Sequence, residues 1–361
     1  MTHNKIKVLI IDDSAVLRHL LAEILSQTDD IEVVGTAQDP LFAMSKITSL
    51  EPDVITLDVE MPRMDGLSFL EQLMRTHPVP VIMISALTQR GGETTLKALE
   101  LGAVDYVTKP GIGIADGIAR LGEEIVHKIR IAARAKVKRR PFRSPTGQHE
   151  QPPPAPLRPE RPSAFDTRCM ATTDRIIAIG ASTGGTQAIT EIITELPEDI
   201  PGIVIVQHMP PLFTRSFAER LNTLSRLDVR EAKSGDRILR GAVLIAPGNK
   251  HMTIQRDGAL YYVEVTDGPM VNFVRPSVDV LFRSVARYAG KNAIGVILTG
   301  MGEDGARGLL EMQRAGALTI AQDESSSTVF GMPKRAIEMH AVDRITPLHE
   351  IASLLAGSSR H

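Results

Sequence analysis

The chain has 361 residues and a formal net charge of −2, and 43% of its residues are hydrophobic. This length suits about two domains that each bury a core. The balanced charge excludes a uniformly basic surface for nucleic acid. The only cysteine is Cys169, so an intramolecular disulfide is excluded. The sequence shows neither a signal-peptide pattern nor an apolar run near the roughly 20 residues of a membrane span, so we expect a cytoplasmic protein without membrane insertion.

The first 125 residues predict a doubly wound α/β domain with a five-stranded parallel sheet. Apolar runs of strand length alternate with helical patterns, and such alternation is typical of parallel strands covered by helices. The expected strands are Lys7–Ile11, Ile31–Val34, Val54–Leu57, Val81–Ile84 and Tyr106–Val107.

Polar side chains follow these strands, at the edge where such sheets bind ligands. Asp12 and Asp13 end the first strand, Asp58 the third and Ser85 the fourth, and Lys109 follows the fifth. Converging carboxylates repel unless a cation lies between them, and oxygen ligands suit Mg²⁺, which also neutralises a phosphoryl group. Asp58 is then a candidate nucleophile toward phosphorus. Any one of these residues alone is more simply a solvated strand-end residue, but together they favour a phosphoryl site.

This domain resembles a response-regulator receiver domain. The resemblance rests on IIDDS at 10–14, LDVEMPRMDGL at 57–67, SAL at 85–87 and DYVTKP at 105–110. It implies that a histidine kinase phosphorylates the domain in the presence of Mg²⁺. It also implies a set of site residues: the phosphoryl acceptor Asp58; the Mg²⁺ ligands Asp13, Asp58 and the Glu60 carbonyl, with Asp12 in support; and the switch residues Ser85, Tyr106 and Lys109.

Residues 126–172 are expected to link two domains. The basic run from Lys128 to Arg140 favours the solvated carboxyl end of a helix. The stretch from Pro141 to Pro162, with PPPAP at 152–156, favours a semi-extended connector.

The stretch RIIAIGASTGG at 175–185 predicts a strand, a tight turn and a helix, with Ser182 on the turn. Glycines beside a serine allow a sharp path that exposes its hydroxyl, and the helix directs backbone N–H groups at the same point. A turn of this kind is also a common cradle for a nucleotide phosphate. However, the next strand, Ile203–Val206, is followed by Gln207 and His208, and not by the carboxylate that would hold a ribose. A general base for Ser182 is therefore favoured.

Residues 173–361 predict a second, mostly parallel α/β domain. The expected strands are Ile176–Ile179, Ile203–Val206, Ala242–Ala246, Ala293–Leu298 and Leu318–Ala321. Apolar runs at Met252–Gln255 and Ala259–Val265 flank Asp257-Gly258, which predicts an added antiparallel hairpin.

Ser182, His208 and Asp304 each come soon after an expected strand, so they can meet at one sheet edge. Ser182 would attack, His208 would take its proton and Asp304 would orient the imidazole. The backbone N–H groups of Met301 and Thr183 are candidates for an oxyanion hole. Each triad residue also has a simpler interpretation, as a helix cap, a surface histidine and a turn residue. The spacing G-x-S-x-G suggests an α/β-hydrolase, but that fold places its acid before its histidine.

The second domain resembles the catalytic domain of the CheB family of chemotaxis methylesterases. The matching pieces are IGASTGG at 179–185, VQHMP at 206–210, APGNKHM at 246–252, GPMVNFVRPSVDVLF at 268–282, LTGMGEDGA at 298–306 and AQDESSSTVFGMP at 321–333. With the receiver resemblance, the similarity spans nearly the whole chain except the linker. It implies a triad of Ser182, His208 and Asp304, with the Met301 amide stabilising the oxyanion.

The family resemblance implies a phosphorylation-activated serine hydrolase that demethylates glutamate γ-methyl esters on chemoreceptors and deamidates receptor glutamines. Mg²⁺ would serve phosphorylation only, and the ester hydrolysis would need no cofactor. The expected partners are methyl-accepting chemotaxis receptors and a chemotaxis histidine kinase, and we expect a monomer. The unphosphorylated first domain should cover the Ser182 site, and phosphate on Asp58 should open it.

Two other functions share part of these features. A transcriptional response regulator would share the first domain, but its output would normally be a small helical DNA reader, unlike the α/β pattern here. A nucleotide-binding module would need GASTGG to bind phosphate.

Overall fold

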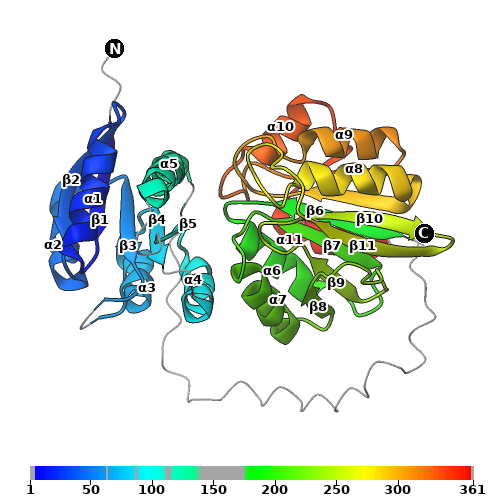
Figure 1. Ribbon diagram of the computed structural model, residues 1–361, viewed down its shortest axis with the longest axis horizontal. Helices are drawn as coiled ribbons and strands as arrows, with labels where there is room; N and C mark the ends of the chain where they lie inside the picture. Colours follow the sequence, from blue (N-terminus) through cyan, green and yellow to red (C-terminus); the bar gives the residue numbers. More distant parts are fainter. Residues whose placement is uncertain are drawn as a thin grey trace.

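The computed structural model describes residues 5–61, 64–85, 88–109, 115–135, 137 and 175–358. Figure 1 shows that they form two α/β domains, each built on its own parallel sheet. In this part of the chain, no helix is long and apolar enough to cross a membrane. The expected Pro-rich connector, 141–162, lies outside the described residues.

The N-terminal domain has a five-stranded parallel sheet in the order β2-β1-β3-β4-β5, as predicted. Its strands are β1 (Ile6–Ile11), β2 (Ile31–Ala37), β3 (Val54–Asp58), β4 (Val81–Ser85) and β5 (Asp105–Thr108). Its helices are α1 (Ala15–Ser26), α2 (Pro40–Leu50), α3 (Gly66–Thr76), α4 (Gln89–Leu101) and α5 (Ala115–Ala132). Buried side chains of α1 and α5 cover one face, and those of α2, α3 and α4 cover the other.

Helix α5 ends at Ala132, within the basic run where a helix end was expected. Residues 126–132, which we assigned to the linker, form its last turns, and Ile129 and Ala132 are fully buried. Lys128 is therefore not a solvated helix-end residue: its Nζ lies 3.1 Å from Asp105 Oδ1 and 3.1 Å from Glu124 Oε1. The helix continues because its apolar face still has a sheet to cover, which charge alone does not reveal.

The C-terminal domain has a seven-stranded parallel sheet in the order β14-β13-β12-β6-β7-β9-β8, with a separate antiparallel pair, β10 and β11. Its strands are β6 (Ile176–Ala181), β7 (Gly202–Gln207), β8 (Asp228–Glu231), β9 (Ala242–Ile245), β10 (His251–Asp257), β11 (Leu260–Thr266), β12 (Ala293–Ile297), β13 (Leu318–Gln322) and β14 (Arg344–Thr346). The predicted fold class is confirmed, but the sequence analysis missed the edge strands β8 and β14. Both are short and partly exposed, so they lack a continuous apolar run.

Helices cover both faces of this second sheet (Figure 1). They are α6 (Gly185–Glu195), α7 (Phe213–Leu224), α8 (Val278–Tyr288), the 3₁₀ turn η2 (Gly290–Asn292), α9 (Ala306–Arg314), α10 (Met332–Glu338) and α11 (Leu348–Ser358). The central strand β6 pairs with β7 on one side and β12 on the other. The chain leaves β6 through α6 toward β7 and leaves β12 through α9 toward β13. Because these two connections diverge, a binding crevice is expected at the carboxyl ends of β6 and β12.

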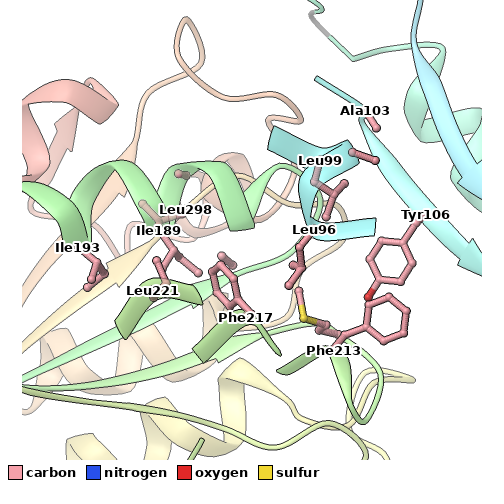
Figure 2. Packing of buried hydrophobic residues seen from close by; sticks show 14 of the residues in the cluster. Leu96, Leu99, Ala103, Tyr106, Ile189, Ile193, Phe213, Phe217, Leu221 and Leu298 are labelled. Carbon is pink, nitrogen blue, oxygen red and sulfur yellow. The ribbon is translucent and has the colours of Figure 1, made fainter. Parts of the chain in front are cut away.

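The two domains share one continuous apolar cluster. Leu96 and Leu99 of α4 and Tyr106 of β5 pack with Phe213 and Phe217 of α7 (Figure 2). The Tyr106 and Phe213 rings are stacked, with centroids 4.8 Å apart and planes at 7°. The N-terminal domain therefore docks with α4 and β5 toward the C-terminal domain.

Candidate functional site

Ser182 lies on a tight turn between β6 and α6. Its backbone N–H donates to the Thr299 carbonyl at 3.0 Å, and its own carbonyl accepts from the Gly185 N–H at 2.7 Å. Gly184 caps the helix with φ of 78°, a left-handed conformation that glycine adopts without strain. The turn therefore exposes the serine at the sheet edge and starts α6 directly behind it.

His208 and Asp304 come together from the ends of β7 and β12. The His208 Nε2 and Asp304 Oδ2 atoms lie 2.9 Å apart. Asp304 is only 3% exposed, and it also accepts hydrogen bonds from Ser277 Oγ at 2.7 Å, the Val278 N–H at 2.6 Å and Asn272 Nδ2 at 2.7 Å. The pair leaves Nδ1 of His208 as the ring nitrogen that can take a proton.

The environment of Asp304 keeps it ionised. Burial alone would raise its pKa, but hydrogen bonds from His208, Ser277 and Asn272, together with the charge interaction with His208, hold the pKa below its ordinary value. An ionised carboxylate at this position fixes the orientation of the His208 ring and stabilises an imidazolium when it forms.

Ser182 and His208 line the same small cavity, of about 20 Å³. Among the described residues, no hydrogen bond joins the Ser182 hydroxyl to the His208 ring. Catalytic hydrogen bonds are often loose before substrate binds, so this geometry fits a base awaiting its substrate.

Two backbone amides lie beside Ser182. Thr183 is the next residue of the turn. On the other side, a Cβ added to Gly300 would lie 2.7 Å from Ser182 Cβ, so the segment leading to Met301 passes directly against the serine. Neither the Thr183 nor the Met301 N–H has a hydrogen-bond acceptor among the described residues. Free donors at this position suit a developing oxyanion.

The N-terminal domain closes the site. Asp105 and Tyr106 of β5 line the same 20 Å³ cavity as Ser182 and His208. The Thr183 hydroxyl donates to Asp105 Oδ2 at 2.5 Å, and Lys128 Nζ lies 3.1 Å from the other oxygen of Asp105. This space, about the size of one water molecule, is too small for a substrate side chain, so the docked receiver domain restricts access to Ser182.

Further contacts hold α4 against α6 and α7. The Gln187 side chain donates to the Leu99 carbonyl, and the Arg220 guanidinium makes a two-point contact with the Glu100 carboxylate. These polar contacts surround the Tyr106–Phe213 stack, which gives the interface a defined register.

The second cluster lies at the carboxyl edge of the N-terminal sheet. Oxygen atoms of Asp12, Asp13 and Asp58 lie within 4.8 Å of one another. Lys109 Nζ lies 2.8 Å from Asp58 Oδ2 and 3.5 Å from Asp12 Oδ2. Burial raises the pKa of Asp58 to about 6, the nearby Asp12 charge adds to this rise, and the Lys109 hydrogen bond opposes it.

This cluster fits the Mg²⁺ that the sequence implies. The donors are all oxygen atoms, and the buried Asp12 Oδ2 has no hydrogen-bond donor among the described residues. Glu60 follows closely, and its N–H lies 3.4 Å from Asp58 Oδ1. The side chain of Ser85 is buried at the end of β4, and its carbonyl accepts from the Lys109 N–H at 2.7 Å.

Comparison with known proteins identifies the family. A family model described as CheB methylesterase matches residues 177–355, and one described as response regulator receiver domain matches residues 8–117. A protein-glutamate methylesterase/protein-glutamine glutaminase of Geobacter metallireducens is 54% identical over 99% of this chain and 97% of its own length. This chain belongs to the protein-glutamate methylesterase/protein-glutamine glutaminase family. The family and hydrolase class predicted from the sequence are thus confirmed.

Other relatives agree with this assignment. A methylesterase/glutaminase of Pseudomonas syringae pv. tomato is 56% identical over 97% of this chain and 98% of its own length. The crystal structure of the Thermotoga maritima CheB methylesterase catalytic domain matches with a TM-score of 0.50 and 39% sequence identity. The match covers 51% of this chain and 98% of that chain. The methylesterase therefore combines a receiver domain with a catalytic domain of this family.

The sequence analysis missed several residues of the methylesterase site. Asn272 and Ser277 both donate to Asp304, and Asp105 reaches Thr183 from the receiver domain. A serine before an amphipathic helix signals an N-cap, and Ser277 does cap α8. That signal does not reveal that the same hydroxyl also binds a distant carboxylate.

Proposed function

We propose that this methylesterase removes methyl groups from glutamate γ-methyl esters of chemoreceptors and deamidates receptor glutamines, with Ser182 as nucleophile. His208 takes the serine proton, and Asp304 orients and charge-stabilises the imidazole. Attack on the ester carbonyl gives an acyl-enzyme and methanol, and water activated by His208 then releases the glutamate. Ammonia leaves a glutamine amide less readily than methanol leaves a methyl ester, so demethylation is the faster reaction.

One observation carries this proposal: the buried, ionised Asp304 bonds to His208, which shares a small cavity with Ser182. The Met301 and Thr183 amides are the proposed oxyanion donors, because both lie beside the serine and have no acceptor among the described residues. This arrangement supports acyl transfer, and the proposed hydrolysis uses these side chains and water.

We further propose that phosphorylation of Asp58 controls access to Ser182. Asp12, Asp13, Asp58 and the Glu60 carbonyl would hold Mg²⁺, which neutralises phosphoryl charge when bound. Lys109 would pair with the phosphoryl oxygens. Lys109 directly follows β5, and β5 carries Tyr106, whose ring lies in the domain interface.

The proposed route to the interface is short. Lys109 now binds Asp58, and its chain neighbours on β5 include Tyr106 and Asp105. When a phosphoryl group and Ser85 draw Lys109 into new contacts, β5 moves against Phe213 and Thr183, and the docked state loses stability. The proposed phosphodonor is a chemotaxis histidine kinase, and we place the protein in the cytoplasm as a monomer.

The test is methanol release from a methylated chemoreceptor fragment by the full chain, before and after a small phosphoryl donor with Mg²⁺. Release should rise with the donor, and a chelator should abolish the rise but not the basal release. Asp58→Asn should keep basal release and lose the rise. Absence of release from every state would reject the esterase, and release that ignores the donor would reject the switch.

Asn272→Ala should weaken the triad through Asp304. The Asn272 amide donates to both Asp304 and Asp279, at 2.7 and 2.9 Å, so its loss leaves two buried carboxylates without the shared donor. The pKa of Asp304 should rise, because a bond that favours the charged form is lost. Because the enzyme is active when the Asp304 carboxylate is ionised, the variant should lose activity on acidification at a higher pH than the parent protein does. Its kcat should also fall about tenfold.

The measurement is the pH profile of kcat/KM for the Asn272→Ala protein. Asn222→Ala on α7 is the matched control, since Asn222 accepts from the Val229 N–H away from the site. An unchanged acidic limb in the Asn272 variant would show that Asn272 does not act through Asp304.

A further inference from the structure

The loop between β11 and α8, residues 267–277, presents two large apolar side chains to solvent. Phe273 is 97% exposed and Met270 is 64% exposed. Exposed aromatic side chains of this kind are enriched at binding sites, because they bury much area at low entropic cost. We call Met270 and Phe273 the apolar tip.

The loop that carries the apolar tip is firmly built. The Arg275 guanidinium donates to Asn249 Oδ1 at 2.7 Å and to the Gly268 carbonyl at 2.7 Å. The His251 ring bonds to the Pro269 carbonyl at 2.8 Å. These contacts fix the base of the loop, so the exposure of its tip is not the result of a loosely held segment.

The tip itself is held in an unfavourable conformation. Asn272 and Phe273 have φ of 53° and 63°, two consecutive non-glycine residues in the left-handed region. Val271 and Val274 exchange backbone hydrogen bonds of 3.2 and 3.1 Å across this turn. Backbone strain is maintained where a function needs the side chain in that position, and here it presents Phe273 outward.

The apolar tip is directly connected to the triad. Asn272, between Met270 and Phe273, donates to Asp304 Oδ1 at 2.7 Å, and Asp304 in turn binds His208. The segment that carries the apolar tip is therefore tied to the triad by a direct hydrogen bond from its own residue Asn272.

The receiver domain leaves the apolar tip uncovered. Its α4 packs against α6 and α7, on the opposite face of the sheet from α8, and Phe273 stays exposed while the domain is docked. The ester group is a small part of a protein substrate, so most binding energy must come from residues around it.

We infer that the apolar tip is the docking point for the substrate protein and binds an apolar side chain of the receptor segment that flanks the modified glutamate. This inference rests on the proposed function. Met270 adapts its shape to different partners, while the rigid Phe273 ring anchors the contact. The tip would position the glutamate ester over Ser182 and discriminate protein substrates from free esters.

The test compares two substrates: the methylated receptor fragment and a blocked glutamate γ-methyl ester without flanking residues. Phe273→Asn removes the ring and keeps a residue that tolerates the left-handed conformation. The ratio of kcat/KM for the receptor fragment to kcat/KM for the small ester should fall about tenfold, mainly through the KM for the fragment. Phe273→Leu should restore much of the ratio.

Leu224→Asn is the matched control, because Leu224 is 46% exposed at the end of α7, and its ratio should equal that of the parent. An unchanged ratio in Phe273→Asn would overturn the inference, as would a parallel loss on both substrates. The parent protein could sediment as a dimer while Phe273→Asn sediments as a monomer with the parent's ratio of kcat/KM values. That result would overturn the inference and assign the tip to contact with a second copy of the chain. Failure of the proposed function is distinct, since the parent protein would then release no methanol from either substrate.

Discussion

Ser182→Ala should lower methanol release from the methylated receptor by about 10⁴-fold or more. The serine hydroxyl is the proposed attacking group, so its loss removes the acyl-enzyme route. His208 and Asp304 remain paired at 2.9 Å, because neither depends on the hydroxyl. The residual rate would come from binding and the oxyanion donors alone.

The effect must be separated from a folding defect. Ser182 holds its turn through backbone bonds to Thr299 and Gly185, which alanine preserves, so thermal unfolding should be unchanged. Ser353→Ala is a matched control, since the Ser353 hydroxyl donates to the Glu350 carbonyl within α11. If Ser182→Ala kept a tenth of the parent rate, a water molecule activated by His208 would be attacking the ester directly.

The strand pattern predicted the main parts of the site. In a parallel sheet, apolar strands end at a common edge, so Ser182, His208 and Asp304 could be expected near each other from chain order alone. The same rule placed Asp12, Asp13 and Asp58 at the edge of the first sheet. In both cases local periodicity and the topology of a doubly wound fold suggested the grouping, and the family resemblance decided the roles.

The supporting residues follow no such rule. Asn272 reaches Asp304 from a loop whose path depends on Arg275, His251 and a pair of left-handed residues. Such geometry depends on contacts between distant parts of the chain, which neither propensity nor spacing encodes. Lys128 was misplaced for a related reason: its partner Asp105 is distant in sequence.

The sequence predicted what the domain interface does, but not which elements form it. The sequence suggested that the first domain covers Ser182, but not that α4 and β5 form the contact. The family resemblance gave Tyr106 a switch role but no contact partner, and Phe213 looks like part of the buried face of an amphipathic helix. Only the docked structure shows that their rings stack between the domains (Figure 2).

Tyr106→Ala should raise basal methanol release, without any phosphodonor, by up to about 30-fold. Tyr106 is 5% exposed and Phe213 is fully buried, with rings 4.8 Å apart. Truncation of a central aromatic anchor costs an interface about 2 kcal/mol or more, which is about a 30-fold change in the docking equilibrium. Because the docked state restricts access to Ser182, the active fraction rises with the open population until the chain is fully open.

A charge exchange tests the same interface without touching the β5 switch strand. Glu100→Arg alone and Arg220→Glu alone each place like charges together at the α4–α7 contact, so each should raise basal release. Because the two side chains contact each other directly, the double variant should return toward the parent rate. Such rescue would require Glu100 and Arg220 to meet in the inactive state in solution.

Basal release that stays at the parent level in Tyr106→Ala and in both single charge variants would mean that this docked arrangement does not limit activity. The restraint on Ser182 would then have to come from the catalytic domain itself.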